Sequence, residues 1–145
     1  FKNLCLNNDG ENGYRGSNIS RVINKFSIQG GNIGFDASQM ENSRMGRYGK
    51  SYNNEPYGPE NYRILHDYPE GGVVSMMKDI QNKNNQDSRF FITTEPSASW
   101  ADGKYVAFGL VTKGMSYVKG MQVINTIPPA NYPEIPIKIV DSGVY

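Results

Sequence analysis

The sequence predicts a mainly β domain, built as a barrel or a sandwich, with one helix near each end. The 145 residues include 16 glycines and 8 prolines, which predict many turns, and 37% of the residues are apolar. Apolar segments are short and separated by turn residues, while helical periodicity occurs only near the two ends of the chain. The length is that of one domain, so residues 1–145 are interpreted as a single domain.

The first half of the chain predicts a helix end, two strands and a long polar loop. Residues 1–10 (FKNLCLNNDG) resemble the last turns of a helix that asparagine and glycine end. Residues 19–23 and 25–29 predict two short strands. Residues 30–62 lack periodicity, which is typical of a functional loop or an insertion. Because the sequence lacks an initiator methionine and begins inside a predicted helix, we expect further residues N-terminal to Phe1.

The second half predicts most of the sheet. The predicted elements are a buried strand over 71–77, a polar loop over 78–88, strands over 89–94 and 106–111, a helix over 115–127 and a closing strand over 137–143. The helix is predicted because Tyr117, Met121 and Ile124 recur with the spacing of one helical face. Residues 128–136 (PPANYPEIP) contain too many prolines for a helix interior.

Charge and cysteine content exclude several classes of protein. The formal net charge is +1, so no strong field is expected to attract nucleic acid or an anionic membrane. No apolar run approaches the length that spans a bilayer, so no membrane insertion is expected. Cys5 is the one cysteine of the sequence and cannot form an internal disulfide, which favours a reducing intracellular compartment or organelle.

The residue types that usually carry catalysis are scarce. His66, the one histidine, lies far from Cys5 in the sequence, and we interpret it as a hydrogen-bonded structural residue. No zinc set, calcium loop or glycine-rich cofactor motif is present, so no metal or cofactor is expected. Asp102 and Asp141 are interpreted as turn residues rather than as a glycosidase pair. Either the protein is no enzyme, or its reaction needs none of these groups.

Several collinear motifs give the sequence a family resemblance. They are SRVINKFSIQGG (20–31), preceded by GYRGS (13–17) and followed by ENYRILH (60–66), GGVVSM (71–76), SRFFITT (88–94), WADGKYVAFGLVTKGM (100–115) and IVDSG (139–143). In this order they resemble the cyclophilin family, whose signature reads Phe-His-Arg-Val-Ile, a short turn, Phe-Met and Gln-Gly-Gly. The resemblance implies an eight-stranded antiparallel barrel capped by two helices, here without its first two strands. It also implies peptidyl-prolyl cis–trans isomerisation, which needs no nucleophile, general base, metal or cofactor.

The resemblance assigns roles to residues that match the family's motifs. They are the catalytic Arg21, the backbone-binding Gln29, the proline-pocket residues Phe26 and Phe91, and Trp100, which in the family also contacts the inhibitor cyclosporin. Strand alternation alone cannot place Arg21, Phe26 and Gln29 on one face, because their spacings are odd. We therefore predict a turn or bulge at residues 24–25.

Other positions of the implied groove depart from the family. Met77, Lys78 and Asp79 replace Ala-Asn-Ala. Lys78 is expected to be tolerated, because the family's asparagine offers mainly its backbone carbonyl, whereas the bulk of Met77 and the charge of Asp79 are expected to narrow the neighbouring subsite. Arg89 replaces a glutamine and adds a second cation near Arg21, which is expected to repel it or to bind another substrate group.

Smaller changes affect the pocket itself. Ala101 replaces a leucine and widens the pocket, whereas Tyr105 replaces a histidine and keeps an aromatic ring and a donor. Ser20 replaces a histidine, and Ser27 replaces a methionine, which makes the pocket wall smaller and more polar. Ser142 replaces a cysteine without a catalytic role.

Three hypotheses follow from this pattern. The first is an isomerase of altered, weakened activity on X–Pro bonds of proline-containing peptides and client proteins. The second is a non-catalytic scaffold or proline-peptide binding subunit of a larger assembly, with segments 32–60 and 78–88 as partner surfaces. The third, binding of single-stranded nucleic acid through tyrosines and basic residues, is disfavoured by the near-zero net charge, so no nucleic-acid partner is expected.

Overall fold

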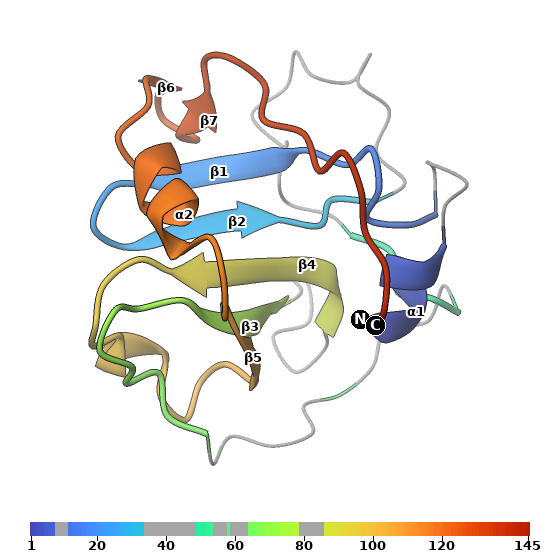
Figure 1. The fold of residues 1–145 in the computed structure, drawn as a ribbon, viewed down its shortest axis with the longest axis horizontal. Coiled ribbons are helices and arrows are strands. Elements are labelled where there is room, and N and C mark those ends of the chain that lie inside the picture. The colour runs from blue at the N-terminus through green and yellow to red at the C-terminus, as the bar shows by residue number, and fades with distance from the viewer. Residues whose placement is uncertain (8–11, 34–48, 54–57, 59–63, 79–85) are drawn as a thin grey trace.

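Seven strands and two α-helices make up the part of the chain that the structure describes (Figure 1). This computed structural model describes residues 1–7, 12–33, 49–53, 58, 64–78 and 86–145. In chain order the elements are α1 (Lys2–Leu6), β1 (Ile19–Ile23), β2 (Ser27–Gly30), β3 (Val73–Lys78), β4 (Gln86–Thr93), the 3₁₀ turn η2 (Ser99–Ala101), β5 (Ala107–Leu110), α2 (Met115–Met121), β6 (Thr126–Ile127) and β7 (Tyr132–Pro133).

Five of the strands form one antiparallel sheet in the order β1-β2-β4-β3-β5, and β6 pairs with β7. The mainly β prediction with a helix towards each end is therefore confirmed. β1 and β5 stand at the two ends of the sheet order, and within the described residues the sheet does not close into a barrel. The predicted closing strand over 137–143 does not form a full strand: Lys138 makes an isolated antiparallel bridge with Asn18, and backbone hydrogen bonds join Ile137 and Ile139 to residues 16–19.

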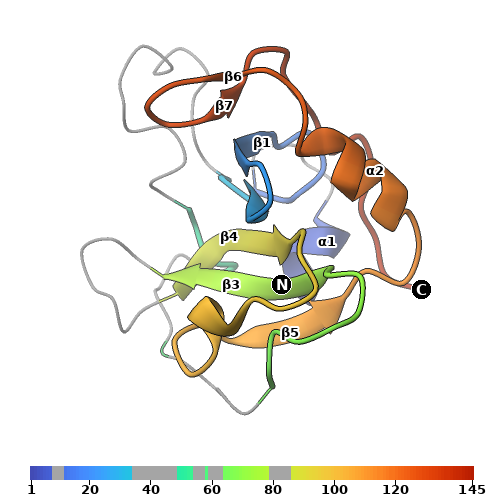
Figure 2. The same ribbon diagram turned by 90° about the vertical axis from the view of Figure 1, so that its left-hand side faces the viewer.

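The two faces of the sheet differ in chemistry. Val22, Ile28, Ile92 and Val74 lie directly opposite one another across β1, β2, β4 and β3. Val22 and Ile28 form one buried apolar cluster with Val118 of α2, and Ile92 packs against it. Val74 packs against a second cluster that contains Phe90. Figures 1 and 2 show α2 over this side of the sheet and α1 beside β4. Because side chains alternate along a strand, the neighbouring positions face the opposite way, on what we call the site face.

The link between β1 and β2 is a tight turn. The prediction of a strand over 19–23 is confirmed, but the second strand begins at Ser27 rather than at Lys25. Lys25 has a positive φ of 55°, and the Phe26 N–H donates to the Ile23 carbonyl at 3.1 Å. The predicted turn at residues 24–25 is thus confirmed. A second irregularity, between Ile19 and Arg21, shifts the β1 register.

The predicted polar loop over 78–88 is wrong at both ends. Lys78 still belongs to β3, and β4 begins at Gln86, with Asp87 and Ser88 buried. These polar residues tolerate burial because they are bonded: the Ser88 hydroxyl, for example, donates to the Gly31 carbonyl at 2.6 Å. Residues 79–85, and most of segment 32–60, lie outside the described residues.

The C-terminal helix is shorter than predicted. α2 ends at Met121, and Thr126 already pairs in β6. Its buried residue is Val118, whereas Tyr117, assigned to the packing face, is 78% exposed. Met115 and Met121, spaced three residues either side of Val118, complete the apolar side. Among the described residues, no helix has the length and apolar character needed to cross a membrane.

Candidate functional site

The residues that the sequence analysis selected meet on the site face. Arg21 in β1 lies opposite Gln29 in β2, and Gln29 lies opposite Phe91 in β4. Residues paired in this way have Cβ atoms roughly 4.5–5.5 Å apart. The row ends at Ser75 of β3, which lies opposite Phe91. Three segments far apart in the sequence therefore contribute neighbouring side chains.

Arg21 is half-buried and keeps an unused donor. Its Nε atom is buried, with no hydrogen-bond partner among the described residues. A buried N–H without an acceptor costs free energy, so such a group calls for an explanation beyond packing. Its cross-strand neighbour Gln29 is also half-buried, and its amide nitrogen donates to the Ser27 hydroxyl at 3.4 Å.

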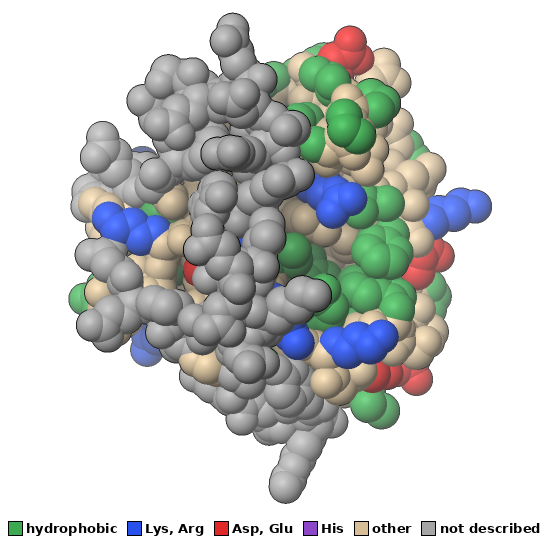
Figure 3. Space-filling model, turned by 180° about the vertical axis from the view of Figure 1, so that it is seen from behind, with side chains coloured by type: hydrophobic (Ala, Val, Ile, Leu, Met, Phe, Trp, Pro, Cys, Tyr) green, Lys and Arg blue, Asp and Glu red, His purple; other side chains and the backbone are tan. Residues whose placement is uncertain are grey.

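Next to this row lies an aromatic cluster, which we define as Phe26, Phe91, Trp100 and Tyr105. Phe26, in the β1–β2 turn, stacks on Trp100 of η2 with ring centroids 4.1 Å apart and planes 15° apart. The Phe91 ring lies 5.5 Å from Trp100 and meets Tyr105 edge-on at 5.2 Å. On the face turned away from α2, Figure 3 shows apolar side chains gathered between basic ones. Phe26, Trp100 and Tyr105 are half-buried and present apolar aromatic surface, whereas Phe91 is 1% exposed and forms the base of the cluster.

Arg89 is internally compensated rather than a free second cation. Its guanidinium is 2% exposed and meets the Asp87 carboxylate, with Nη2 at 2.7 Å and Nε at 3.0 Å. The same Nη2 donates to the Lys78 carbonyl at 3.1 Å. The expected repulsion of Arg21 is therefore reduced, because Asp87 neutralises Arg89 within the protein. The sequence analysis missed Asp87, since an acid two residues before an arginine is an ordinary surface pattern.

The other altered positions surround the aromatic cluster. The Lys78 ammonium lies 5.6 Å from the centre of the Tyr105 ring. Met77, next to it in β3, is half-buried. Ala101 is fully buried within η2, and Ser27 is fully buried beneath Gln29. Asp79 lies outside the described residues.

His66 is a fully buried, hydrogen-bonded residue, as interpreted from the sequence. Its Nδ1 lies 2.9 Å from Asp102 Oδ1, and its Nε2 lies 2.6 Å from the Ser75 hydroxyl. Its backbone N–H also donates to Asp102 Oδ1 at 2.7 Å. These hydrogen bonds, first the backbone one and then that from the ring, hold the pKa of Asp102 below its usual value.

The arrangement Ser75–His66–Asp102 has the connectivity of a nucleophilic triad but not its accessibility. Ser75 and His66 both have 0% exposure. A nucleophile must reach a substrate carbonyl, which this buried serine inside a strand cannot do. The sequence analysis missed the contact because a serine within an apolar strand carries no distinctive spacing to a distant histidine.

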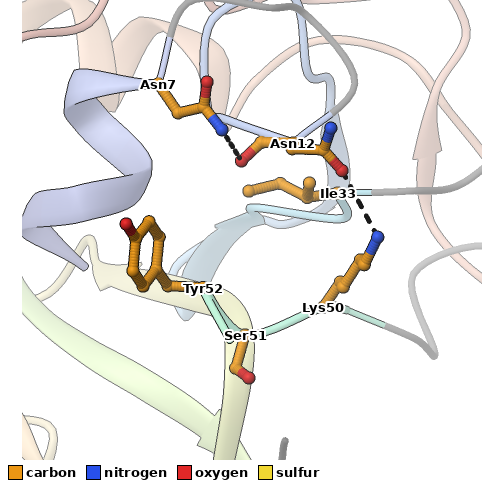
Figure 4. A pocket seen from close by; sticks show the side chains of 6 residues that line it. All are labelled: Asn7, Asn12, Ile33, Lys50, Ser51 and Tyr52. Atoms are coloured by element: carbon orange, nitrogen blue, oxygen red, sulfur yellow. Dashed lines mark hydrogen bonds between the residues drawn. The ribbon is translucent and has the colours of Figure 1, made fainter. Parts of the chain in front are cut away.

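A separate polar cavity of about 370 Å³ lies near the end of α1 (Figure 4). It is lined by Asn7, Asn12, Ile33, Lys50, Ser51 and Tyr52. The Asn7 amide donates to the Asn12 carbonyl at 3.1 Å, and the Lys50 ammonium lies 3.3 Å from the Asn12 side-chain oxygen. None of the selected site residues lines it. In the described part of the chain, no three His, Cys, Asp or Glu residues gather as a metal site would require.

The family model and the relatives that match this chain all describe the same family. The family model described as "Cyclophilin type peptidyl-prolyl cis-trans isomerase/CLD" matches residues 1–144. "Peptidyl-prolyl cis-trans isomerase D" of Saccharomyces cerevisiae is 38% identical over 143 residues, which cover 99% of this chain and 57% of the relative. "Peptidyl-prolyl cis-trans isomerase B" of the same organism is 35% identical over 125 residues, covering 86% of this chain and 55% of the relative. The chain thus spans little more than half the length of these relatives.

Proposed function

The chain belongs to the family of cyclophilin-type peptidyl-prolyl cis-trans isomerases, and on this premise we propose that the protein isomerises X–Pro bonds of peptides and client proteins. The observation that carries the proposal is the buried Arg21 Nε without a hydrogen-bond partner among the described residues, in register with Gln29 and Phe91. A reaction that breaks no covalent bond agrees with the complete burial of Ser75 and His66, the serine–histidine pair described above.

The proposed catalysis acts on the resonance of the peptide bond. Rotation faces a barrier of ~18–20 kcal/mol because the amide loses resonance as it twists. In the twisted state the proline nitrogen recovers its lone pair and accepts a hydrogen bond that the planar amide accepts poorly. The Arg21 guanidinium donates that bond in our proposal. A fixed donor that binds the twisted state better than the planar state lowers the barrier without tighter substrate binding.

Gln29 and the aromatic cluster hold the substrate in this scheme. The Gln29 side chain stands between Arg21 and Phe91 in the cross-strand row, so its amide binds the substrate backbone beside the reacting bond. The cluster receives the proline ring. Burial of the three ring methylenes is worth roughly 2 kcal/mol, at about 0.8 kcal/mol for each methylene. The ring is thereby held while the rest of the peptide rotates.

Further contacts set the neighbouring subsite. We propose that Met77, Lys78 and Arg89 form its wall, together with Ala101 and Tyr105 at the cluster. The bond from Arg89 to the Lys78 carbonyl supports this grouping, because it fixes the end of β3 beside the cluster. The family acts on proline-containing peptides, and the substituted wall favours a narrower choice of neighbouring residue.

A second candidate function is membership of a larger assembly. Large apolar side chains are exposed on and after α2, which favours a partner surface there. They are Tyr117, Val123, Ile127, Ile135 and Val140. In that case the site binds a proline peptide without catalysing its isomerisation.

Exchange NMR on a proline tetrapeptide, without a coupled protease, separates the two functions. We expect cis–trans exchange cross-peaks with the protein, their loss with Arg21→Ala, and no change with Arg15→Ala, a matched exposed arginine outside the site. Peptide shift changes without exchange would replace the isomerase by a binding module. Absence of both effects would reject the site.

A further inference from the structure

We infer that His66 is a positioning residue for the aromatic cluster: it joins the segment that carries Trp100 and Tyr105 to the strand opposite Phe91. The catalytic part of this inference rests on the proposed isomerase function, whereas the positioning part rests on contacts alone. His66 is itself fully buried, so it does not touch the substrate.

The two ring nitrogens of His66 have different partners and fixed roles. The ionised Asp102 carboxylate can only accept, so the ring proton lies on Nδ1, 2.9 Å away. Nε2 is then the acceptor, and the Ser75 hydroxyl donates to it across 2.6 Å. The low pKa of the Asp102 carboxyl group agrees with this proton arrangement. One ring thus links a carboxylate and a hydroxyl that come from different segments.

On the Asp102 side, His66 fastens both ends of η2. The Ala98 N–H, at the start of this turn, donates to the His66 carbonyl at 2.9 Å. Asp102, at its end, accepts from the His66 backbone at 2.7 Å and from the ring. The turn between them carries Trp100, and the Tyr105 N–H donates to the Ala101 carbonyl at 3.0 Å. Two members of the aromatic cluster therefore depend on this attachment.

On the Ser75 side, His66 lies beside the third member of the cluster. Its ring is nearly parallel to that of Phe91, with centroids 6.0 Å apart and planes 11° apart. Ser75 is the cross-strand partner of Phe91, so the bond to Nε2 ties the histidine to the same row of the sheet. The separation between Phe91 and Trp100, 5.5 Å, is thus set through His66.

Two substitutions separate the two hydrogen bonds that the His66 ring makes, one to Asp102 and one to Ser75. His66→Asn keeps an amide near the position of Nδ1, so it retains the bond to Asp102 and loses the one to Ser75. His66→Gln reaches towards Nε2 and loses the ring's bond to Asp102, while the backbone N–H of residue 66 keeps its own bond to Asp102. Trp100, the single tryptophan of the sequence, reports the result through acrylamide quenching of its fluorescence, and a Trp100→Phe protein gives the background.

We expect His66→Gln to raise the quenching constant of Trp100 by about twofold or more, and to lower kcat/KM by about tenfold or more, because small misplacements of binding groups are costly. His66→Asn should keep Trp100 quenching near the wild-type value. Tyr14→Phe is the matched control: it removes a buried hydrogen bond, to the Ser88 carbonyl at 2.7 Å, outside the aromatic cluster. It should lower stability and leave both readouts unchanged.

Asp102→Ala keeps the test decisive if His66→Gln does not fold. Asp102 is 28% exposed, and its loss removes both the ring's bond and the backbone bond from His66, so its effect on Trp100 should be at least as large. A folded His66→Gln or Asp102→Ala protein with wild-type quenching would overturn the inference. So would increased quenching with wild-type kcat/KM. If the wild-type protein shows no isomerase activity but His66→Gln still exposes Trp100, the proposed function fails and the positioning role of His66 stands.

Discussion

Two arginines on the site face meet different surroundings. Arg21 keeps a buried Nε without a partner among the described residues, whereas Arg89 meets Asp87 and the Lys78 carbonyl. The Arg21 Nε–H is suited to donate a hydrogen bond to a substrate atom. The arrangement of Arg89 suits a structural ion pair that fixes the wall of the site, because its desolvated charges already compensate one another.

Removing one partner of this ion pair should be costly. Asp87→Ala leaves the Arg89 guanidinium buried without its carboxylate, and we expect a loss of about 3–5 kcal/mol in the free energy of unfolding. Denaturant unfolding measures this loss. The double variant Asp87→Ala with Arg89→Gln should recover most of it, because the unpaired charge is gone. A cost below about 1 kcal/mol for Asp87→Ala, the value of an exposed pair, would mean that the pair is not desolvated.

The lowered pKa of Asp102 predicts a dependence of stability on pH. A carboxyl group whose pKa is lower in the folded state stabilises the protein above its unfolded pKa, about 3.9. This contribution is lost as the pH falls through the lower folded pKa. The difference in unfolding free energy between wild type and Asp102→Asn should therefore be largest near neutral pH and shrink below about pH 4. A difference that stays constant between pH 7 and pH 3 would contradict the assignment.

At the scale of elements, the turn between β1 and β2 positions Phe26. Lys25 adopts a positive φ of 55°, and its N–H donates to the Gln122 side chain at 2.9 Å. This turn lets Phe26 reach Trp100 while Arg21 and Gln29 face the same side from two strands. The proposed catalysis therefore depends on a backbone conformation as well as on side chains.

Proline at position 25 should damage both stability and activity. Its ring fixes φ near −65° and removes the N–H, so Lys25→Pro conflicts with the observed φ of 55° and with the bond to Gln122. We expect a loss of about 3 kcal/mol in the free energy of unfolding and a higher KM for the proline peptide. Lys25→Gly, which accepts a positive φ freely, is the matched control and should keep both values close to wild type. Equal behaviour of the two variants would mean that the turn is not required.

Helices, strands and turns could be predicted from the sequence where the local pattern of apolar and turn residues determines them. The β-branched run at 19–23 gave β1, and the odd spacing of Arg21 and Phe26 required the turn that is observed. Polar residues 86–88 were assigned to a loop because their burial depends on partners elsewhere, such as the Gly31 carbonyl. The same applies to His66, whose contacts with Ser75 and Asp102 arise only when three segments meet.

At the scale of the whole molecule, large apolar side chains exposed near the C-terminus bear on whether the domain acts alone or as part of an assembly, because a partner would cover them. Ile135, in the proline-rich segment 128–136, is 79% exposed, and Val140, in the segment that was predicted to form the closing strand, is 78% exposed. Within the described residues β5 ends the main sheet, whereas the outer edge of β1 is already partly paired: the Val22 N–H donates to the Asn131 carbonyl at 2.9 Å and the Ile19 N–H to the Ile137 carbonyl at 2.8 Å. Such features favour association with another segment or chain.

Hydrophobic dye binding tests this surface. The chain should bind the dye and associate at high concentration, and the double variant Ile135→Lys with Val140→Lys should reduce both effects. Its free energy of unfolding should change by no more than about 0.5 kcal/mol, because both side chains are exposed. Light scattering and dye fluorescence measure the two effects. Unchanged dye binding in a folded double variant would show that Ile135 and Val140 do not form the surface that binds the dye.

The central claim is that Arg21 acts on the twisted peptide bond rather than on substrate binding. The most direct measurement is exchange NMR at saturating proline peptide, with the Kd of the same peptide, for wild type and Arg21→Ala. We expect exchange to fall by about 10²–10³-fold while Kd changes by less than about threefold, since a donor to the twisted state affects turnover alone. A Kd that rises in proportion to the loss of exchange, or exchange that persists in Arg21→Ala, would contradict the account.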